Sequence, residues 1–225
     1  MKLIKSPFSS AVLLIGLLGL LAAPVSADYE AGMKAYEAGN FEAALEEFTE
    51  DAQRGHALAQ FNLGMMYHYA QGTEQNYERA MQLYALSAQQ GLARAQYHLA
   101  SMYDNGEGTE QDYREAYRWY QMAAELGDAA AQYALGTMNF YGQGKRRDYP
   151  EALLWYELSA AQGNRDAQYN LGVMYASAYG TDANAEQALR WFVTAADNGS
   201  ADAQYNAGLM YAEGKGGAQD YRMAR

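Results

Sequence analysis

The sequence contains no cysteine and only three histidines among its 225 residues. Without cysteine the chain forms no disulfide and offers no thiolate to a zinc ion, so its stability has to come from packing. The histidines, His56, His68 and His98, do not have the spacing of metal ligands. We interpret them as isolated polar side chains on solvated helix faces, and the sequence predicts no metal site and no cofactor.

Basic residues are also scarce. Lysine and arginine number 16 against 27 aspartates and glutamates, which gives a formal net charge of −11. An acidic protein is repelled by nucleic acid and by anionic membrane surfaces. The balance therefore indicates no nucleic-acid partner and favours a basic or neutral protein or peptide.

The chain also lacks an apolar run long enough for a comfortable membrane span, which needs about 20 residues. The apolar run from Ala11 to Ala23 is shorter, follows Lys2 and Lys5, and precedes the small residues 25–27. This pattern is typical of a secretory signal peptide over residues 1–27, with an uncleaved anchor as the alternative. We expect cleavage after Ala27, export to the periplasm with secretion as the alternative, and no stable membrane insertion after cleavage.

What the chain does contain is a repeat with a period of 36 residues, marked by Gln60, Gln96, Gln132, Gln168 and Gln204. Within one copy, Ala95, Leu99 and Met102 have helical spacing, and Tyr113, Ala116 and Tyr120 repeat that spacing further on. Two amphipathic helices per period predict stacked helix-turn-helix units.

Short polar residues and glycines mark the helix ends. We predict helix N-caps at Asn76, Asp112, Asp128, Asp148, Asn164, Asn184, Ser200 and Asp220, and C-terminal glycines at Gly55, Gly91, Gly127, Gly163 and Gly199. Four further glycines lie inside a predicted first helix, where glycine costs about 1 kcal/mol relative to alanine. We predict that these glycines, Gly64, Gly136, Gly172 and Gly208, are points of close contact between helices.

The repeated phrase of alanine, glutamine, tyrosine, leucine-glycine, methionine-tyrosine, glycine-x-glycine, aspartate-tyrosine and tryptophan-tyrosine closely resembles the Sel-one-like repeat (SLR) family of the tetratricopeptide superfamily. The resemblance implies an all-α fold: a right-handed α/α superhelical solenoid whose first helices line a concave face and which acts as a protein-binding adaptor. It assigns residues 28–55 to a tetratricopeptide-like N-terminal hairpin and residues 56–225 to repeats at 56–91, 92–127, 128–163, 164–199 and, in part, 200–225. Because the sequence stops early in the last repeat, we expect a fragment, a frayed end or an end completed by a partner.

A binding face should vary between copies where the scaffold stays constant. Four positions of the first helix vary in this way, and they supply the candidate partner-binding residues Asn62, Met65, His68, Tyr69, His98, Ser101, Asp104, Asn105, Thr137, Phe140, Tyr141, Asn170, Val173 and Asn206. The asparagines among them either bond to the backbone of an extended ligand or form a solvated face. A basic loop of Lys145, Arg146 and Arg147 is either solvated or a docking point for an acidic partner.

No enzyme signature is present. Some cysteine-rich relatives in the family are associated with β-lactam hydrolysis, but no serine here is followed three residues later by lysine, and serine-aspartate-asparagine and lysine-threonine-glycine are absent. The sequence therefore predicts a non-catalytic, exported scaffold that binds a protein or peptide. The alternatives are a secreted host-interaction factor and, disfavoured by the missing motifs, a serine hydrolase of the β-lactamase type.

Overall fold

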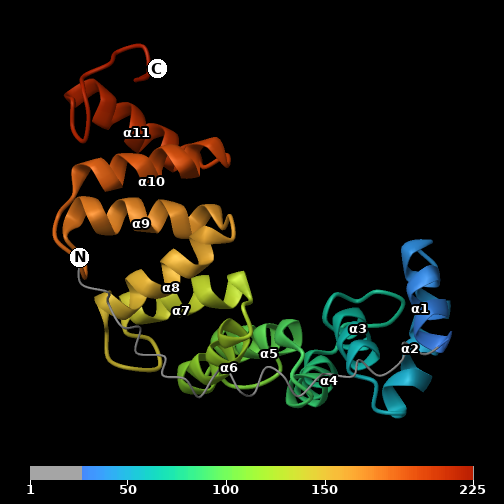
Figure 1. Cartoon of the computed structure of the whole chain (residues 1–225). Coiled ribbons are helices and arrows are strands. Elements are labelled where there is room, and N and C mark those ends of the chain that lie inside the picture. The colour runs from blue at the N-terminus through green and yellow to red at the C-terminus, as the bar shows by residue number, and fades with distance from the viewer. Residues whose placement is uncertain (1–26, 225) are drawn as a thin grey trace, which may run out of the picture.

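The computed structural model describes residues 27–224, which form eleven α-helices and no strand (Figure 1). All of the predicted signal peptide except Ala27 lies outside the described residues. The helices in chain order are α1 (Ala27–Glu37), α2 (Phe41–Gln53), α3 (Ala57–His68), α4 (Tyr77–Gln89), α5 (Ala93–Asn105), α6 (Tyr113–Glu125), α7 (Ala129–Tyr141), α8 (Tyr149–Ala161), α9 (Arg165–Ser177), α10 (Ala185–Asp197) and α11 (Ala201–Glu213).

Each helix packs on the next one along the chain, so the pairs stack in sequence order. The stack follows an open curve from α1 at one end to α11 at the other (Figure 1). The first helices α3 and α5 lie toward the inside of the bend, and the second helices α4 and α6 lie toward the outside (Figure 1). The prediction of an all-α solenoid built from two-helix repeats is confirmed.

Seven of the eight predicted caps begin a helix, because each is a local contact between a short side chain and the next turn, whereas Asp220 accepts from two backbone amides but begins no helix within the described residues. Asn76, Asn184 and Asp148 accept a hydrogen bond from the backbone N–H three residues on, and Asp112 accepts two. First helices α7, α9 and α11 are capped in the same way by Asp128, Asn164 and Ser200. These bonds satisfy amides that the helix itself leaves unpaired.

The repeated glutamine joins three successive helices. The Gln60 side-chain amide donates to the Ala52 carbonyl at 3.2 Å, and its oxygen accepts from the Gln90 amide at 2.8 Å. Gln162 and Asn198 make the same 2.8 Å bond to Gln132 and Gln168. In the second repeat this donor is missing because Leu126 occupies its position, and the buried Gln96 Oε1 has no partner among the described residues.

Three of the four glycines inside the first helices, Gly64, Gly136 and Gly172, lie in close contact with the second helix, as predicted, whereas Gly208 faces the backbone of Ala224, which lies outside any helix. A Cβ atom at Gly136 would lie 2.5 Å from Tyr156 Cδ1, and one at Gly172 would lie 2.6 Å from Phe192 Cδ1. Both distances are shorter than any side chain tolerates. The missing side chain therefore allows the second helix of a repeat to pack the Tyr156 or Phe192 ring directly onto the first helix.

Candidate functional site

Most of the predicted partner-binding residues lie along the first helices α3, α5, α7 and α9, and Asn206 lies on α11. Their exposure differs widely: the Tyr141 side chain is 69% exposed, Met65 and Thr137 are partly buried, and His68 is only 8% exposed. The predicted face is thus a mixture of projecting and recessed groups. Five of its fourteen residues meet at one place.

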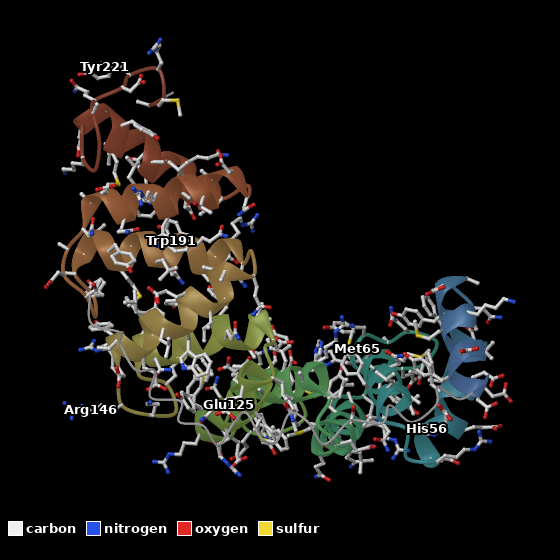
Figure 2. All side chains as sticks on the ribbon, viewed as in Figure 1. His56, Met65, Glu125, Arg146, Trp191 and Tyr221 are labelled. Carbon is white, nitrogen blue, oxygen red and sulfur yellow. The ribbon has the colours of Figure 1, made fainter. Side chains whose placement is uncertain are left out.

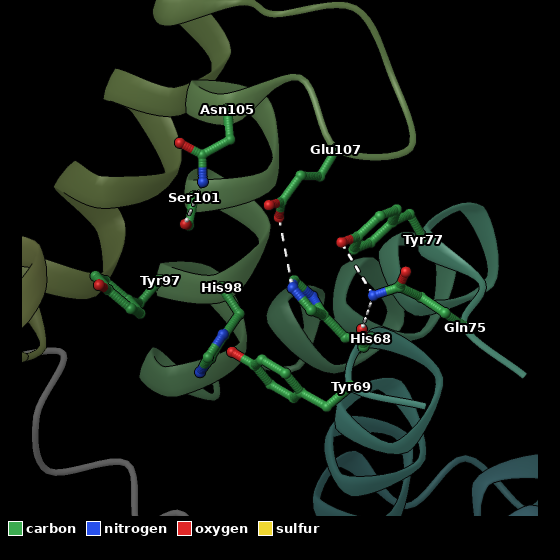
Figure 3. Close-up of a pocket in the computed structure, with 9 residues that line it drawn as sticks. All are labelled: His68, Tyr69, Gln75, Tyr77, Tyr97, His98, Ser101, Asn105 and Glu107. Carbon is green, nitrogen blue, oxygen red and sulfur yellow. Dashed lines mark hydrogen bonds and ion pairs between the residues drawn. The ribbon is translucent and has the colours of Figure 1, made fainter. Parts of the chain in front are cut away.

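That place is the α3–α5 hollow, a cavity of about 330 Å³ between two neighbouring first helices (Figure 3). Nine residues line it. Five belong to the predicted face, namely His68, Tyr69, His98, Ser101 and Asn105. The sequence analysis missed the other four, which are Gln75, Tyr77, Tyr97 and Glu107.

His68 is the last residue of α3 and forms part of the hollow's wall (Figure 3). Its Nε2 lies 3.5 Å from Glu107 Oε2, and its ring meets the Tyr77 ring edge-on at 5.2 Å. Burial lowers the pKa of His68, and Glu107 opposes this shift only in part, so the environment favours the neutral ring. The buried Nδ1 has no hydrogen-bond partner among residues 27–224.

His98, on α5, stacks on the Tyr84 ring at 5.3 Å and lies 5.4 Å from the Phe61 ring. Burial, with a smaller effect from His68, lowers the pKa of His98 to about 4. For these two histidines, the prediction of isolated side chains on solvated faces is wrong. Stacking places α3 beside α5, so two histidines 30 positions apart share one wall. No group of three potential metal ligands occurs within the described part of the chain.

Tyr84 lies at the base of this aromatic cluster, and its buried hydroxyl has no partner among the described residues. The hydroxyls of its counterparts are bonded: Tyr120 donates to Asp104 at 3.5 Å, and Tyr156 lies 3.2 Å from the Thr137 hydroxyl. Burial, followed by Tyr69 and Glu107, raises the pKa of Tyr84. Among the described residues, Tyr84 of the first repeat is therefore the member of this series whose buried hydroxyl has no hydrogen-bond partner.

The asparagines of the predicted face bond within the protein. The Asn62 amide donates to the Tyr29 hydroxyl at 3.2 Å, and the Asn206 amide donates to the Tyr169 hydroxyl at 3.5 Å. Asn170 bonds to the hydroxyl of Tyr156. These amides link neighbouring helices, so a ligand's backbone would have to compete for them.

The third repeat presents a different surface at the equivalent positions. Phe140 stands where the first repeat has His68, and its ring contacts Tyr149 and Tyr179, both at about 5 Å. Tyr179 takes the position of Glu107. Aromatic rings therefore fill the space that is hollow between α3 and α5, and Tyr141 projects beside them. Val173, one repeat further on, is partly buried against the core of α9, α10 and α11.

The basic loop is partly neutralised by its own repeat. The Lys145 ammonium lies 2.5 Å from Glu151 Oε2 and 5.3 Å from the centre of the Tyr117 ring. The Arg147 guanidinium lies 5.0 Å from the centre of the Tyr149 ring. Arg146 projects from the outer edge of the stack (Figure 2). Arg146 is thus the loop cation that remains exposed without a partner among residues 27–224.

Glu107 could have been found by extending the comparison of copies into the loop. Its position reads Gln71, Glu107, Gln143, Tyr179 and Lys215, which varies as much as the helix positions do. Tyr77 and Tyr97 recur in most copies, and a rule that looks for variation excludes them. No local signal distinguishes a recurring tyrosine that only packs from one that also lines a cavity.

No helix within residues 27–224 is both long and apolar enough to cross a membrane. The sequence pattern of the Sel1 repeat matches residues 57–92, 93–128, 129–164, 165–200 and 201–225. None of the curated proteins matches the chain.

Solved structures resemble the chain closely. One is a protective antigen of uropathogenic Escherichia coli with an SLR fold, which is 33% identical with a TM-score of 0.85 over 88% of this chain. The chain spans 43% of that protein's length. A Sel1 repeat protein from Oxalobacter formigenes is 31% identical with a TM-score of 0.83, over 87% of this chain and 81% of that one.

An immunity protein from Pseudomonas aeruginosa shares the fold at 19% identity and a TM-score of 0.53, over 90% of this chain and 80% of that one. The five matched repeats cover most of the sequence, and the two closer structures share both fold and repeat type. The chain belongs to the Sel1-repeat family.

Proposed function

We propose that this protein is an exported, non-catalytic scaffold that binds a protein or peptide along the first-helix face of its solenoid. One observation carries the proposal. Five of the residues that vary between repeats meet in the α3–α5 hollow, where the buried His68 Nδ1 has no partner among the described residues. The Tyr84 ring packs against the His68 and His98 rings, and its buried hydroxyl is also unpaired within residues 27–224. Scaffold residues such as Gln60 use their hydrogen bonds within the stack. Unused hydrogen-bonding capacity beside variable side chains favours a ligand.

The charge of this face supports a basic or neutral partner. None of the twenty positions in the four varying columns carries lysine or arginine, whereas Asp104 and Glu213 are acidic, and Glu107 adds a carboxylate at the hollow. A face of this sign attracts cationic segments and repels nucleic acid.

Export rests on the N-terminal sequence. We propose that residues 1–27 direct the chain to the periplasm, with release from the cell as the alternative. Cell fractionation separates the two destinations, and N-terminal sequencing of the exported protein should begin at Asp28. A protein found only in the cytoplasm with its N-terminus intact would contradict export.

Photo-crosslinking tests the binding face. A benzoylphenylalanine replaces Tyr141, which projects from first helix α7, and a control replaces Leu158, an exposed apolar residue of second helix α8. Irradiation of living cells should give discrete adducts from the first position and none from the second. Equal labelling from both positions, or adducts from Leu158 alone, would contradict a first-helix binding face.

A further inference from the structure

We infer that the α3–α5 hollow binds a lysine or arginine side chain of the partner, an inference that rests on the proposed function and names the chemistry of its anchor. The hollow combines a carboxylate that faces no cation within the described residues, a wall of aromatic rings and the unpaired His68 Nδ1, and the unpaired Tyr84 hydroxyl belongs to a ring packed against two residues of that wall. Three separate observations support this assignment.

The first observation is the charge of Glu107. Its side chain is 30% exposed, and its carboxylate lies 3.5 Å from the His68 ring, whose burial favours the neutral form. None of the nine residues that line the hollow is lysine or arginine. A half-desolvated carboxylate that faces a neutral ring gains more from a cation than one in open water does, because the surrounding dielectric is lower.

The second observation is the wall. Tyr69, Tyr77 and Tyr97 line the hollow together with His68 and His98 (Figure 3). Aromatic faces attract cations, by about 0.5–1 kcal/mol at exposed sites and about 2 kcal/mol or more where water is excluded. The third repeat contains the same combination within the chain: Lys145 lies over the Tyr117 ring and bonds to Glu151. This scaffold therefore already accommodates a cation between a tyrosine and a glutamate.

The third observation is the unpaired atoms. If His68 donates its Nε2 hydrogen to Glu107, the ring is the tautomer whose Nδ1 is an acceptor, and that acceptor has no donor within residues 27–224. The Tyr84 hydroxyl beneath the rings is also unpaired. An ammonium carries three N–H donors and a guanidinium carries five, whereas an apolar or anionic ligand would leave the acceptor unsatisfied.

The third and fourth repeats have aromatic residues at the positions equivalent to His68 and Glu107. There Phe140 and Tyr179 replace His68 and Glu107, and their rings pack against each other at 5.4 Å. The same fold therefore tolerates a filled site at these positions. The double substitution His68→Phe with Glu107→Tyr should close the hollow without disturbing the stack.

The test is an NMR titration of the purified, isotope-labelled protein with Nα-acetyl-arginine methylamide and Nα-acetyl-lysine methylamide. The matched control ligand is Nα-acetyl-norleucine methylamide, which has the same backbone and an uncharged chain. We expect saturable shifts at His68, Ser101 and Asn105 with the two cations, and at least tenfold weaker binding of the norleucine compound. Absence of saturable shifts at these residues, or equal binding of all three compounds, would overturn the inference.

Three variants test whether cation binding depends on the Glu107 carboxylate and on the open hollow. Glu107→Gln should weaken binding of both cations at least tenfold, and the filled double variant should abolish it. Glu110→Gln removes an exposed carboxylate from the same loop and should bind as the unmodified protein does. Equal loss in both single variants would mean a general charge effect and would contradict a specific site.

The two proposals fail separately. If adducts at Tyr141 persist while the hollow binds neither cation, the partner-binding face stands and the anchor is wrong. If the hollow binds the cations but Tyr141 gives no adduct, the anchor stands and the proposed first-helix face is wrong.

Discussion

The missing donor at Leu126 gives a stability prediction with a known geometry. The three equivalent positions, Gln90, Gln162 and Asn198, each place a side-chain amide 2.8 Å from the oxygen of a repeated glutamine. The backbone angles at Leu126, φ −83° and ψ 1°, match those at Gln90, φ −84° and ψ 3°. Leu126→Gln should therefore supply the missing donor to Gln96 Oε1 without moving the backbone.

The expected size follows from two opposing effects. A hydrogen bond to a buried acceptor is worth about 0.5–1.5 kcal/mol net, and a buried acceptor left unpaired costs about 1–3 kcal/mol. The Leu126 side chain is 59% exposed, so its replacement removes little apolar burial, and glutamine keeps two of the methylene groups. We expect a gain of about 1 kcal/mol, which corresponds to a rise of about 2–4 °C in Tm for a chain of this size.

Thermal and urea unfolding followed by circular dichroism at 222 nm measure this gain. Leu126→Ala separates the loss of the leucine side chain from the gain of the amide and should not stabilise. Gln162→Leu makes the reverse change in the next repeat and should destabilise by about 1–2 kcal/mol. If Leu126→Gln leaves Tm unchanged while Gln162→Leu is also neutral, the glutamine contact carries no stability and the reasoning fails.

Three further predictions follow from the helix contacts, the buried histidine and the absent catalytic motifs. Gly136→Leu should lower Tm by several degrees because its side chain meets the Tyr156 ring, whereas Ala130→Leu on the same helix should change Tm little; equal melts would contradict the close packing. Since the pKa of His98 falls to about 4 on folding, the unfolded chain binds a proton there that the folded chain refuses between about pH 6.5 and pH 4. As the pH falls through that window, the free energy of unfolding should drop by up to about 3 kcal/mol. His98→Asn, which carries the residue found in other copies, should show a smaller drop when urea unfolding is compared at about pH 6.5 and pH 4. Identical pH profiles for the two proteins would refute this prediction. A chromogenic β-lactam should show no turnover above background, and measurable hydrolysis would contradict a non-catalytic scaffold.

The parts of the fold that the sequence predicted are those determined by local or periodic contacts. Asp148 caps α8 through the amide of a residue three positions away, so the cap could be predicted from the sequence. The role of Gly136 could be predicted as well, because a helix keeps glycine in its interior in four of five copies only for a spatial reason. The glutamine series marked the period. Its hydrogen bonds required the structure, since donor and acceptor lie 30 positions apart in different helices.

The hollow could be predicted only in part, because it depends on the position of α5 relative to α3 along the helix axes. Variation between copies selected His68, His98 and Ser101, yet it gave no sign that the two histidine rings share one cavity. The expectation of solvated histidines failed because each copy was considered separately from its neighbour. Tyr77 was missed because its recurrence indicated a scaffold role, although the residue serves both packing and the cavity wall.

The unpaired buried atoms also separate a structural defect from a functional site. Gln96 Oε1 lies among scaffold residues, so providing its partner through Leu126→Gln should raise stability and leave cation binding unchanged. His68 Nδ1 and Tyr84 Oη lie beside a carboxylate and several aromatic rings. Filling this second place with Phe and Tyr at positions 68 and 107 should also raise stability, since the third repeat packs well with those residues, but it should abolish binding. Functional sites commonly lower stability in this way. A filled variant that gains stability and still binds the arginine compound would show that the two unpaired atoms are defects of the same kind.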